Sequence, residues 1–344
     1  MSFFSTKKKI IIAAAAIIAA AVGCYFMFKK DNRFDVDTSK INLQVKIERF
    51  DQDIYHTDTT RINEEIARFR QKYGEFFDVY SQGVMEFGNP EDEEFALTFK
   101  AFLRDSVFHD VYTESLQVFD DVSDIEKKLT DAFRRVKHHF PNKRIPRVLM
   151  HVSGFNQSVV TTDSVLSISI DNYLGKDYAL YSNLVFRYQL TGMVPEKVPS
   201  DYMTGWLLSE FPMQKPTERL LDNILYRGKI MFTLEKLMPN EDECLLMTYT
   251  PEQMKWCYDN ERQMWTYMME EKHLFKSERM ISAKYINEAP STAFFPDESP
   301  GRTGIWIGWQ IIRSYMKNNP SVSLAQLMDN ENYQEILEKS GYRP

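Results

Sequence analysis

Two neighbouring segments decide the fold: SDYMTGWLLSEF at Ser200–Phe211 and TERLLDNILYRGKIMFTLEKL at Thr217–Leu237. Both segments read as helices, and Thr217 is a residue type that caps the start of a helix. Two short apolar segments precede them, Arg147–His151 and Ser164–Ile170, and their length and β-branched residues predict strands. A strand pair followed by two helices is therefore the expected centre of the chain.

The remainder of the chain predicts further helices and little additional sheet. Gln44–Arg49 alternates polar and apolar residues and indicates a third strand. Helical patterns cover Thr60–Tyr73, Asn89–Leu103, Asp121–Phe140, Thr250–Phe275, Gly301–Lys317 and Pro320–Ser340. We expect an α+β fold that is predominantly α-helical, with one small β-sheet packed on about ten helices.

Two of these helices carry clear start signals. Ser123 and Glu126 have the spacing of a capping box for the helix that ends before Pro141. Thr250 is a capping residue and Pro251 a favoured first helical residue, which predicts one long helix to about Phe275.

Composition excludes several classes of protein. The chain has 344 residues, of which 43% are hydrophobic, so it can form a substantial core and is not disordered by composition. The net charge is −7, and removal of Lys7, Lys8 and Lys9 with a leader would make it −10 (−7 minus 3). No basic stripe offsets this charge, so nucleic acid is not an expected partner.

The N-terminus predicts export and a membrane tether. The three lysines precede an apolar run, Ile10–Phe28, which contains Ala21-Val-Gly-Cys24 in the form of a lipobox. The first interpretation is a signal peptide with lipidation, palmitate included, at Cys24. The alternative is an uncleaved signal anchor, since nineteen apolar residues are about enough to cross a bilayer. Either way, residues 1–28 are the targeting segment, 29–42 a tether and 43–344 a single globular domain facing the periplasm.

Several motifs in order give the chain a family resemblance. They are Ser169–Gly175, Trp206–Pro212, Leu221–Lys229 and Pro300–Gly308. Together with the exported N-terminus they resemble the gliding-motility lipoprotein GldB family, from about residue 40 to the C-terminus. The resemblance implies an envelope lipoprotein linked to gliding motility and the associated protein-secretion machinery. GldB proteins are in turn distantly similar to gluzincin-like metallopeptidases, which implies a zincin-like domain.

The zinc ligands of such a peptidase are missing from the chain. The first helix would carry His-Glu-x-x-His, which places two ligands on one face. Tyr202–Glu210 contains no histidine, and Leu or Trp cannot replace imidazole as a ligand. Glu210 remains, and Asp222 and Glu235 are acids on the second helix. We therefore expect a degenerate zincin-like domain with no metal, no cofactor and no catalytic residues.

A polar pocket for a peptide or partner segment is the expected remnant of this cleft. Its candidate residues follow the strands or lie on the helices: His151, Asp171, Asn172, Arg227 and Arg302, with Tyr173 and Lys229 beside them. A buried strand-end role remains the more common one for a histidine such as His151.

Two smaller features carry structural expectations. Gly304 and Gly308 lie on one face of a helix and allow close approach of a neighbouring element, expected in the sheet region. Cys244 and Cys257 are the only possible disulfide pair within the domain, and the sequence leaves their pairing open.

Three functions remain in competition. The leading one is a non-enzymatic, membrane-anchored envelope protein that binds partner proteins of a motility or secretion complex. The second is a hydrolase with an atypical site built from His151, Glu210, Asp171 or Asp222. The third is an envelope solute-binding lipoprotein.

Overall fold

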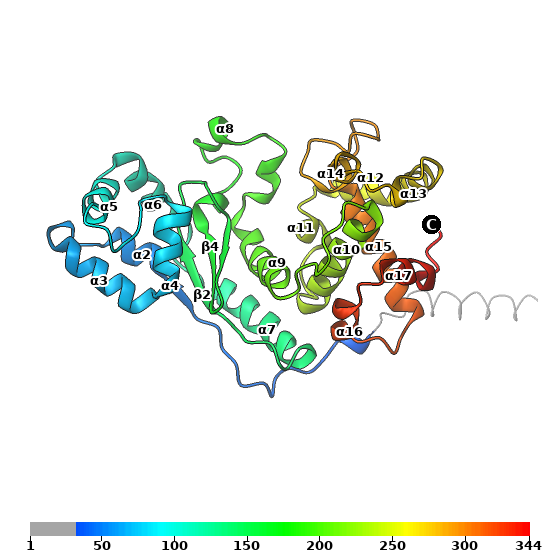
Figure 1. The fold of residues 1–344 in the computed structure, drawn as a ribbon, viewed down its shortest axis with the longest axis horizontal. Helices are drawn as coiled ribbons and strands as arrows, with labels where there is room; N and C mark the ends of the chain where they lie inside the picture. Colours follow the sequence, from blue (N-terminus) through cyan, green and yellow to red (C-terminus); the bar gives the residue numbers. More distant parts are fainter. Residues whose placement is uncertain (1–31) are drawn as a thin grey trace, which may run out of the picture. The chain divides into compact units, whose positions relative to one another are not determined.

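The computed structural model describes residues 32–344 (Figure 1). The chain divides into two compact units, Met1–Asp37 and Thr38–Pro344, and the first contributes only the short helix η1 (Asn32–Phe34) to the description. The expected targeting segment and Cys24 lie outside the described residues. None of the helices formed by residues 32–344 combines the length and the apolar character needed to cross a membrane.

The second unit is mostly helical and contains one small mixed sheet, which confirms the expected α+β class. Its strands are β1 (Ile47–Arg49), β2 (Arg147–His151), β3 (Val159–Thr161) and β4 (Val165–Ser169). Its helices are α2 (Phe50–Tyr55), α3 (Ile62–Tyr73), α4 (Glu75–Val79), α5 (Phe95–Leu103), α6 (Ser106–Val118), α7 (Ser123–His139), α8 (Tyr181–Leu184), α9 (Val198–Glu210), α10 (Leu220–Leu237), α11 (Glu243–Met247), α12 (Pro251–Asp259), α13 (Glu261–Glu270), α14 (Arg279–Ile286), α15 (Thr303–Asn318), α16 (Leu324–Asp329) and α17 (Tyr333–Ser340).

The sheet has the strand order β1-β2-β4-β3. β2 lies parallel to both β1 and β4, with Val148 opposite Ile47 and Leu166, whereas β3 pairs antiparallel with β4 at the edge. All five residues of β4 are buried, as in a strand that is covered on both faces. The two predicted central strands are therefore direct neighbours, and β3, which was not predicted, lies in the segment between them.

An aromatic cluster fills one side of this sheet. Phe50 of α2 is fully buried at its centre, and α2 packs against β2. Its ring meets those of Tyr73 and Tyr80 edge-on, each at 4.8 Å between centroids, and that of Phe76 at 5.1 Å. Edge-to-face contacts at such distances add to the free energy gained by burying the rings. In Figure 1 the helices of this cluster, α2 to α6, lie on one side of the sheet.

The opposite side of the sheet is covered by α9, which packs on β3 and β4, with α7 against α9 (Figure 1). Gly205 of α9 permits this contact, because a Cβ atom there would lie 2.6 Å from the side chain of Val159. α10 packs on α9 in turn, and α15 packs on α10.

The contact between α10 and α15 is made by backbone. A Cβ atom on Gly308 would overlap the carbonyl oxygen of Ile224, and one on Gly228 would overlap the backbone of Gly308. A Cβ on Gly304 would lie 2.8 Å from the Cβ of Tyr285 in α14. The predicted close approach therefore exists, but its partners are α10 and α14, and the expectation that it involves the sheet region was wrong. The physical reason is that α9 already covers the side of the sheet opposite the aromatic cluster, so α15 packs on α10 and α14 instead.

The predicted helix starts have mixed outcomes. Thr250 and Gln253 form a capping box, and Pro251 lies in the first turn, as predicted. The prediction of one long helix to Phe275 was wrong, because Asn260 separates α12 from α13. The expected box at Ser123 was also wrong, since Val122 holds the N-cap position and Ser123 is already the first residue of the helix. Glu126 instead accepts a hydrogen bond at 3.0 Å from the backbone N–H of Ile47 and thereby joins α7 to β1.

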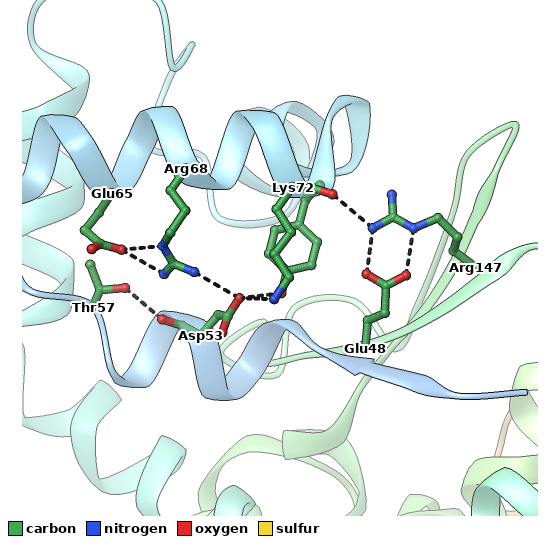
Figure 2. A network of polar contacts seen from close by, with 8 residues as sticks. Glu48, Asp53, Thr57, Glu65, Arg68, Lys72 and Arg147 are labelled. Carbon is green, nitrogen blue, oxygen red and sulfur yellow. Dashed lines mark hydrogen bonds and ion pairs between the residues drawn. The ribbon is translucent and has the colours of Figure 1, made fainter.

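A polar network fastens the N-terminal helices to the sheet edge (Figure 2). The carboxylate of Asp53 in α2 accepts from Lys72 and Tyr73 of α3, each at 2.7 Å, and pairs with Arg68 at 3.2 Å. The backbone oxygen of Lys72 accepts from Arg147 of β2 at 3.0 Å. Lys72 therefore links the charges around Asp53 to the strand.

We expect Gly308→Ala to destabilise the protein by roughly 3 kcal/mol or more, at the upper end of overpacking, because a backbone carbonyl cannot rotate out of the way. Thermal and denaturant unfolding of the purified chain measure the change. Gly83→Ala is the matched control, since a Cβ atom there meets nothing within 4 Å and Gly83 does not have a positive φ. Equal stability of both variants would contradict the packing described for α10 and α15.

Asp53→Asn is expected to lower the free energy of unfolding at pH 7 by up to about 1 kcal/mol, since the group is partly exposed and screened. Burial alone would raise the pKa of Asp53, but hydrogen bonds from Lys72 and Tyr73 outweigh it and lower the pKa. The stabilisation is therefore present above the unfolded-state pKa of about 3.9 and is lost as the pH falls through the lower folded-state value.

Denaturant unfolding at pH 7 and at acid pH measures this difference. The exposed Asp120→Asn is the control and should change stability little at either pH. A deficit of Asp53→Asn that does not shrink on acidification would show that the carboxylate charge is not the cause.

Candidate functional site

A cavity of about 410 Å³ lies where α9, α10 and the start of α15 face the segments that follow β2 and β4. Its lining includes Phe155, Ser158, Asn172, Tyr173, Val185, Tyr188, Met193, Lys197, Asp201, Thr204, Arg227, Ile230, Tyr249, Glu288, Arg302 and Ile305. The volume is within the roughly 300–1,000 Å³ typical of ligand pockets. Ser158 is exposed, so the cavity is reached from solvent.

The structure brings three of the five sequence-predicted residues to this cavity. Asn172, Arg227 and Arg302 line it, whereas Asp171 and His151 do not. Lys229 also points elsewhere: its ammonium group is buried and donates to the backbone oxygens of Met328 at 3.0 Å and Asn330 at 2.8 Å. Burial lowers the pKa of Lys229 to about 8, and its role is to fasten α10 to the end of α16.

His151 belongs to the core of the sheet. Its Nδ1 atom lies 2.7 Å from the hydroxyl of Ser167, and its ring packs against Phe76 and Tyr80 of the aromatic cluster. Burial lowers the pKa of His151 to about 3, so the imidazole is neutral at physiological pH. The Nε2 atom has no hydrogen-bond partner among the described residues.

Asp171 does not line the cavity, but its hydrogen bonds support the cavity wall. Its buried carboxylate accepts hydrogen bonds from the backbone N–H groups of Ser153 at 3.1 Å and Phe155 at 2.6 Å, and from the hydroxyl of Ser169. Burial raises the pKa of Asp171, and these hydrogen bonds oppose the rise. Gly154 and Phe155 both have φ of +66°, so the bonds hold a turn that places Phe155 at the cavity.

An ion pair forms the wall on the α9 side. Lys197 is buried and its Nζ lies 3.0 Å from Asp201, one helical turn further along. The other oxygen of Asp201 accepts from the hydroxyl of Tyr173 at 2.9 Å. Burial, together with the charge of Asp201, raises the pKa of Tyr173 well above its usual value, so Tyr173 remains a neutral donor.

Arg302 forms the wall on the α15 side. It occupies the N-cap position with φ of +60°, an unusual backbone conformation for a residue other than glycine. Its guanidinium group donates to the backbone oxygen of Met247, stands over the ring of Tyr249 and lies 4.0 Å from the carboxylate of Glu288.

Arg227 differs from the other two cations of the cavity. Among the described residues its only interaction is with the ring of Tyr226, at 6.0 Å from the centroid, and it forms no ion pair. The cavity thus has three cations, Lys197, Arg227 and Arg302, and two carboxylates, Asp201 and Glu288. Lys197 and Arg302 each lie near one of these carboxylates, so the net charge of +1 in the lining corresponds to Arg227.

The chemistry of the lining does not fit a zinc centre. The side chains that α9 presents to the cavity are Asp201 and Thr204, and none is a histidine. Within residues 32–344, no group of three or more His, Cys, Asp or Glu side chains is placed to hold a metal ion. Structural and catalytic zinc sites use at least three such ligands.

The acids proposed for an atypical hydrolase have separate surroundings. Glu210 pairs with Lys143 at 3.0 Å and lines a different hollow, beside Trp206 and Ser209. Asp222 is paired with Arg219. Glu235, the other acid noted on α10, was not part of that proposed site; it accepts hydrogen bonds from Trp309 and Arg313, each at 2.9 Å. Cys244 and Cys257 are both free thiols in the described part of the chain.

Comparison with protein families assigns the chain. The model of the family described as gliding motility protein GldB matches residues 31–344. The chain belongs to the GldB family. Membership makes it a gliding-motility-associated lipoprotein, in agreement with the resemblance seen in the sequence. Comparison with curated proteins and with solved structures gave no match, so the zincin-like relation of this GldB-family chain stays a prediction.

Sequence reasoning missed several residues of the cavity. Phe155 is far from Lys197 and Asp201 in the chain, and only the fold brings it to the same cavity. The i, i+4 spacing of Lys197 and Asp201 at the start of a predicted helix was an available signal for the ion pair. The turn at Phe155 had only Gly154 as a signal.

Proposed function

We propose that this protein is a non-enzymatic component of the cell envelope that binds a segment of a partner protein in the cavity between α9, α10 and α15. The observation that carries the proposal is the cavity lining: it offers cations, hydrogen-bond donors and aromatic surface where a peptidase would need metal ligands. The family connection to gliding motility supports partners in an envelope motility or secretion complex.

The N-terminal segment indicates where in the cell the protein is located. A lipid on Cys24, or the apolar run Ile10–Phe28 as a signal anchor, would tether the chain and leave the described domain in the periplasm. Either tether keeps the cavity close to a membrane, where the subunits of an envelope complex assemble.

A small-molecule ligand is the second candidate, and the size of the cavity favours it. A volume of about 410 Å³ suits a solute as well as two or three side chains of a peptide. The two candidates differ in one consequence, since only a protein partner gives a covalent adduct of higher mass when a crosslinker is placed at the cavity.

A photo-crosslinking amino acid at Ser158, on the exposed rim, tests the proposal in living cells. We expect a discrete protein adduct that disappears in the Arg227→Gln and Arg302→Asn variants while folding is unchanged. Asparagine is chosen at Arg302 because it tolerates the positive φ.

Two controls make the result specific. Arg262→Gln removes an exposed arginine of α13 outside the cavity lining and should leave the adduct intact. The crosslinker at the exposed Gln263 should not give the same adduct. An adduct from Ser158 that persists in both cavity variants would exclude the cavity as the partner site.

A further inference from the structure

We propose that the group recognised by the cavity is a carboxylate, carried next to an apolar side chain by the bound segment. This inference rests on the proposed function and specifies its ligand class. Three independent features of the cavity lead to it: an unpaired guanidinium group, an unpaired amide donor and an exposed apolar rim.

The first feature is Arg227. Lys197 and Arg302 each have a carboxylate within the cavity, Asp201 and Glu288, whereas Arg227 has none among the described residues. A guanidinium group presents a planar set of donors that matches a carboxylate through two parallel hydrogen bonds. The guanidinium group of Arg227 is therefore available to a carboxylate of a ligand.

The second feature is Asn172. Its Nδ2 group is buried in the cavity wall and has no hydrogen-bond partner among the described residues. Buried donors in proteins are nearly always paired, and Asn172 lines the cavity, so a rotation of its side chain would bring the unpaired Nδ2 group to an acceptor of the ligand. An anionic oxygen is the strongest acceptor available.

The two helices that begin at the cavity, α9 and α15, also favour a negatively charged ligand. Lys197 and Asp201 lie at the start of α9, and Arg302 and Ile305 lie at the start of α15, so the N-terminal turns of two long helices face the site. The N-terminus of a helix carries a partial positive charge. The carboxylates of Asp201 and Glu288 limit this potential, which favours a single negative charge over a doubly charged phosphate.

The third feature is the apolar rim. Phe186 is 70% exposed, which is unusual for a large apolar side chain. Phe186 stacks on Tyr188 at 5.7 Å, and Tyr188 with Val185 lines the cavity itself. Phe186, Tyr188 and Pro290, together with Arg187, border a second hollow that is mostly apolar. An apolar or aromatic side chain next to the carboxylate would cover this surface.

The carboxylate has two possible sources, the side chain of Asp or Glu and the C-terminus of a chain. Three matched probes distinguish them: N-acetylphenylalanine with a terminal carboxylate, acetyl-Phe-Glu-amide with a side-chain carboxylate, and the neutral acetyl-Phe-Gln-amide. Ligand-observed NMR with the full-length protein detects and compares the weak binding of such small probes.

We expect at least one acidic probe to bind at least about tenfold more tightly than the neutral one. Arg227→Gln should reduce its binding to the level of the neutral probe, and Asn172→Asp should weaken it by charge repulsion. Arg262→Gln should change nothing, and thermal unfolding checks that all three variants fold. The tighter of the two acidic probes identifies the source of the carboxylate.

Equal binding of the acidic and neutral probes, acid binding that survives Arg227→Gln in a folded variant, or no binding of either acid would each overturn the inference. These outcomes are separable from the fate of the proposed function. If the acidic preference is absent while the adduct from Ser158 still depends on the cavity, partner binding stands and the carboxylate does not. If the acids bind but Ser158 gives no adduct, recognition of a carboxylate stands and binding of a partner protein does not.

Discussion

The backbone contact between α10 and α15 is the constraint on which the cavity depends. Gly228 and Gly308 remove the side chains that would separate the two helices, and the carbonyl of Ile224 occupies the space where a Cβ of Gly308 would lie. A contact of this kind allows little adjustment, because both surfaces are backbone. Arg227 precedes Gly228, and Arg302 opens the helix that contains Gly308, so this one contact sets where two of the three cavity cations lie.

The opposite wall of the cavity is set by polar contacts within the sheet region. Asp171 fixes the turn that carries Phe155, and Asp201 is held between Lys197 and Tyr173. A small sheet followed by two helices is the arrangement that led us to expect a zincin-like domain, and that relation remains a prediction. The side chains that reach the cavity suit an anionic, partly apolar ligand instead. The family assignment to gliding-motility lipoproteins is consistent with a scaffold used for recognition.

Much of the fold was predictable, because hydrophobic periodicity and capping residues are local signals. The central strands and both central helices were identified in this way, as was the cap at Thr250. Strand β3 was not, because three residues within a polar segment carry too little periodicity. The capping box expected from Ser123 and Glu126 is absent because Val122 holds the N-cap position, and Glu126 binds β1, a contact between residues far apart in the chain.

The cavity was predictable only in part, for a related reason. Asn172, Arg227 and Arg302 were chosen by their position after a strand or on the central helices, and these positions do meet in space. Position alone could not tell which side of a strand or helix faces the cavity, so His151 and Lys229 were placed there with them. In the structure their polar atoms are used in the core, by Ser167 and by the end of α16.

The central claim is that this layout holds a cationic recognition site and not a metal centre. The metal content of the purified full-length chain, measured by mass spectrometry after exposure to zinc and dialysis, tests it most directly. The account predicts no stoichiometric zinc. One tightly held zinc ion per chain would contradict it, and His151, whose Nε2 atom has no partner among the described residues, would then be the first residue to replace.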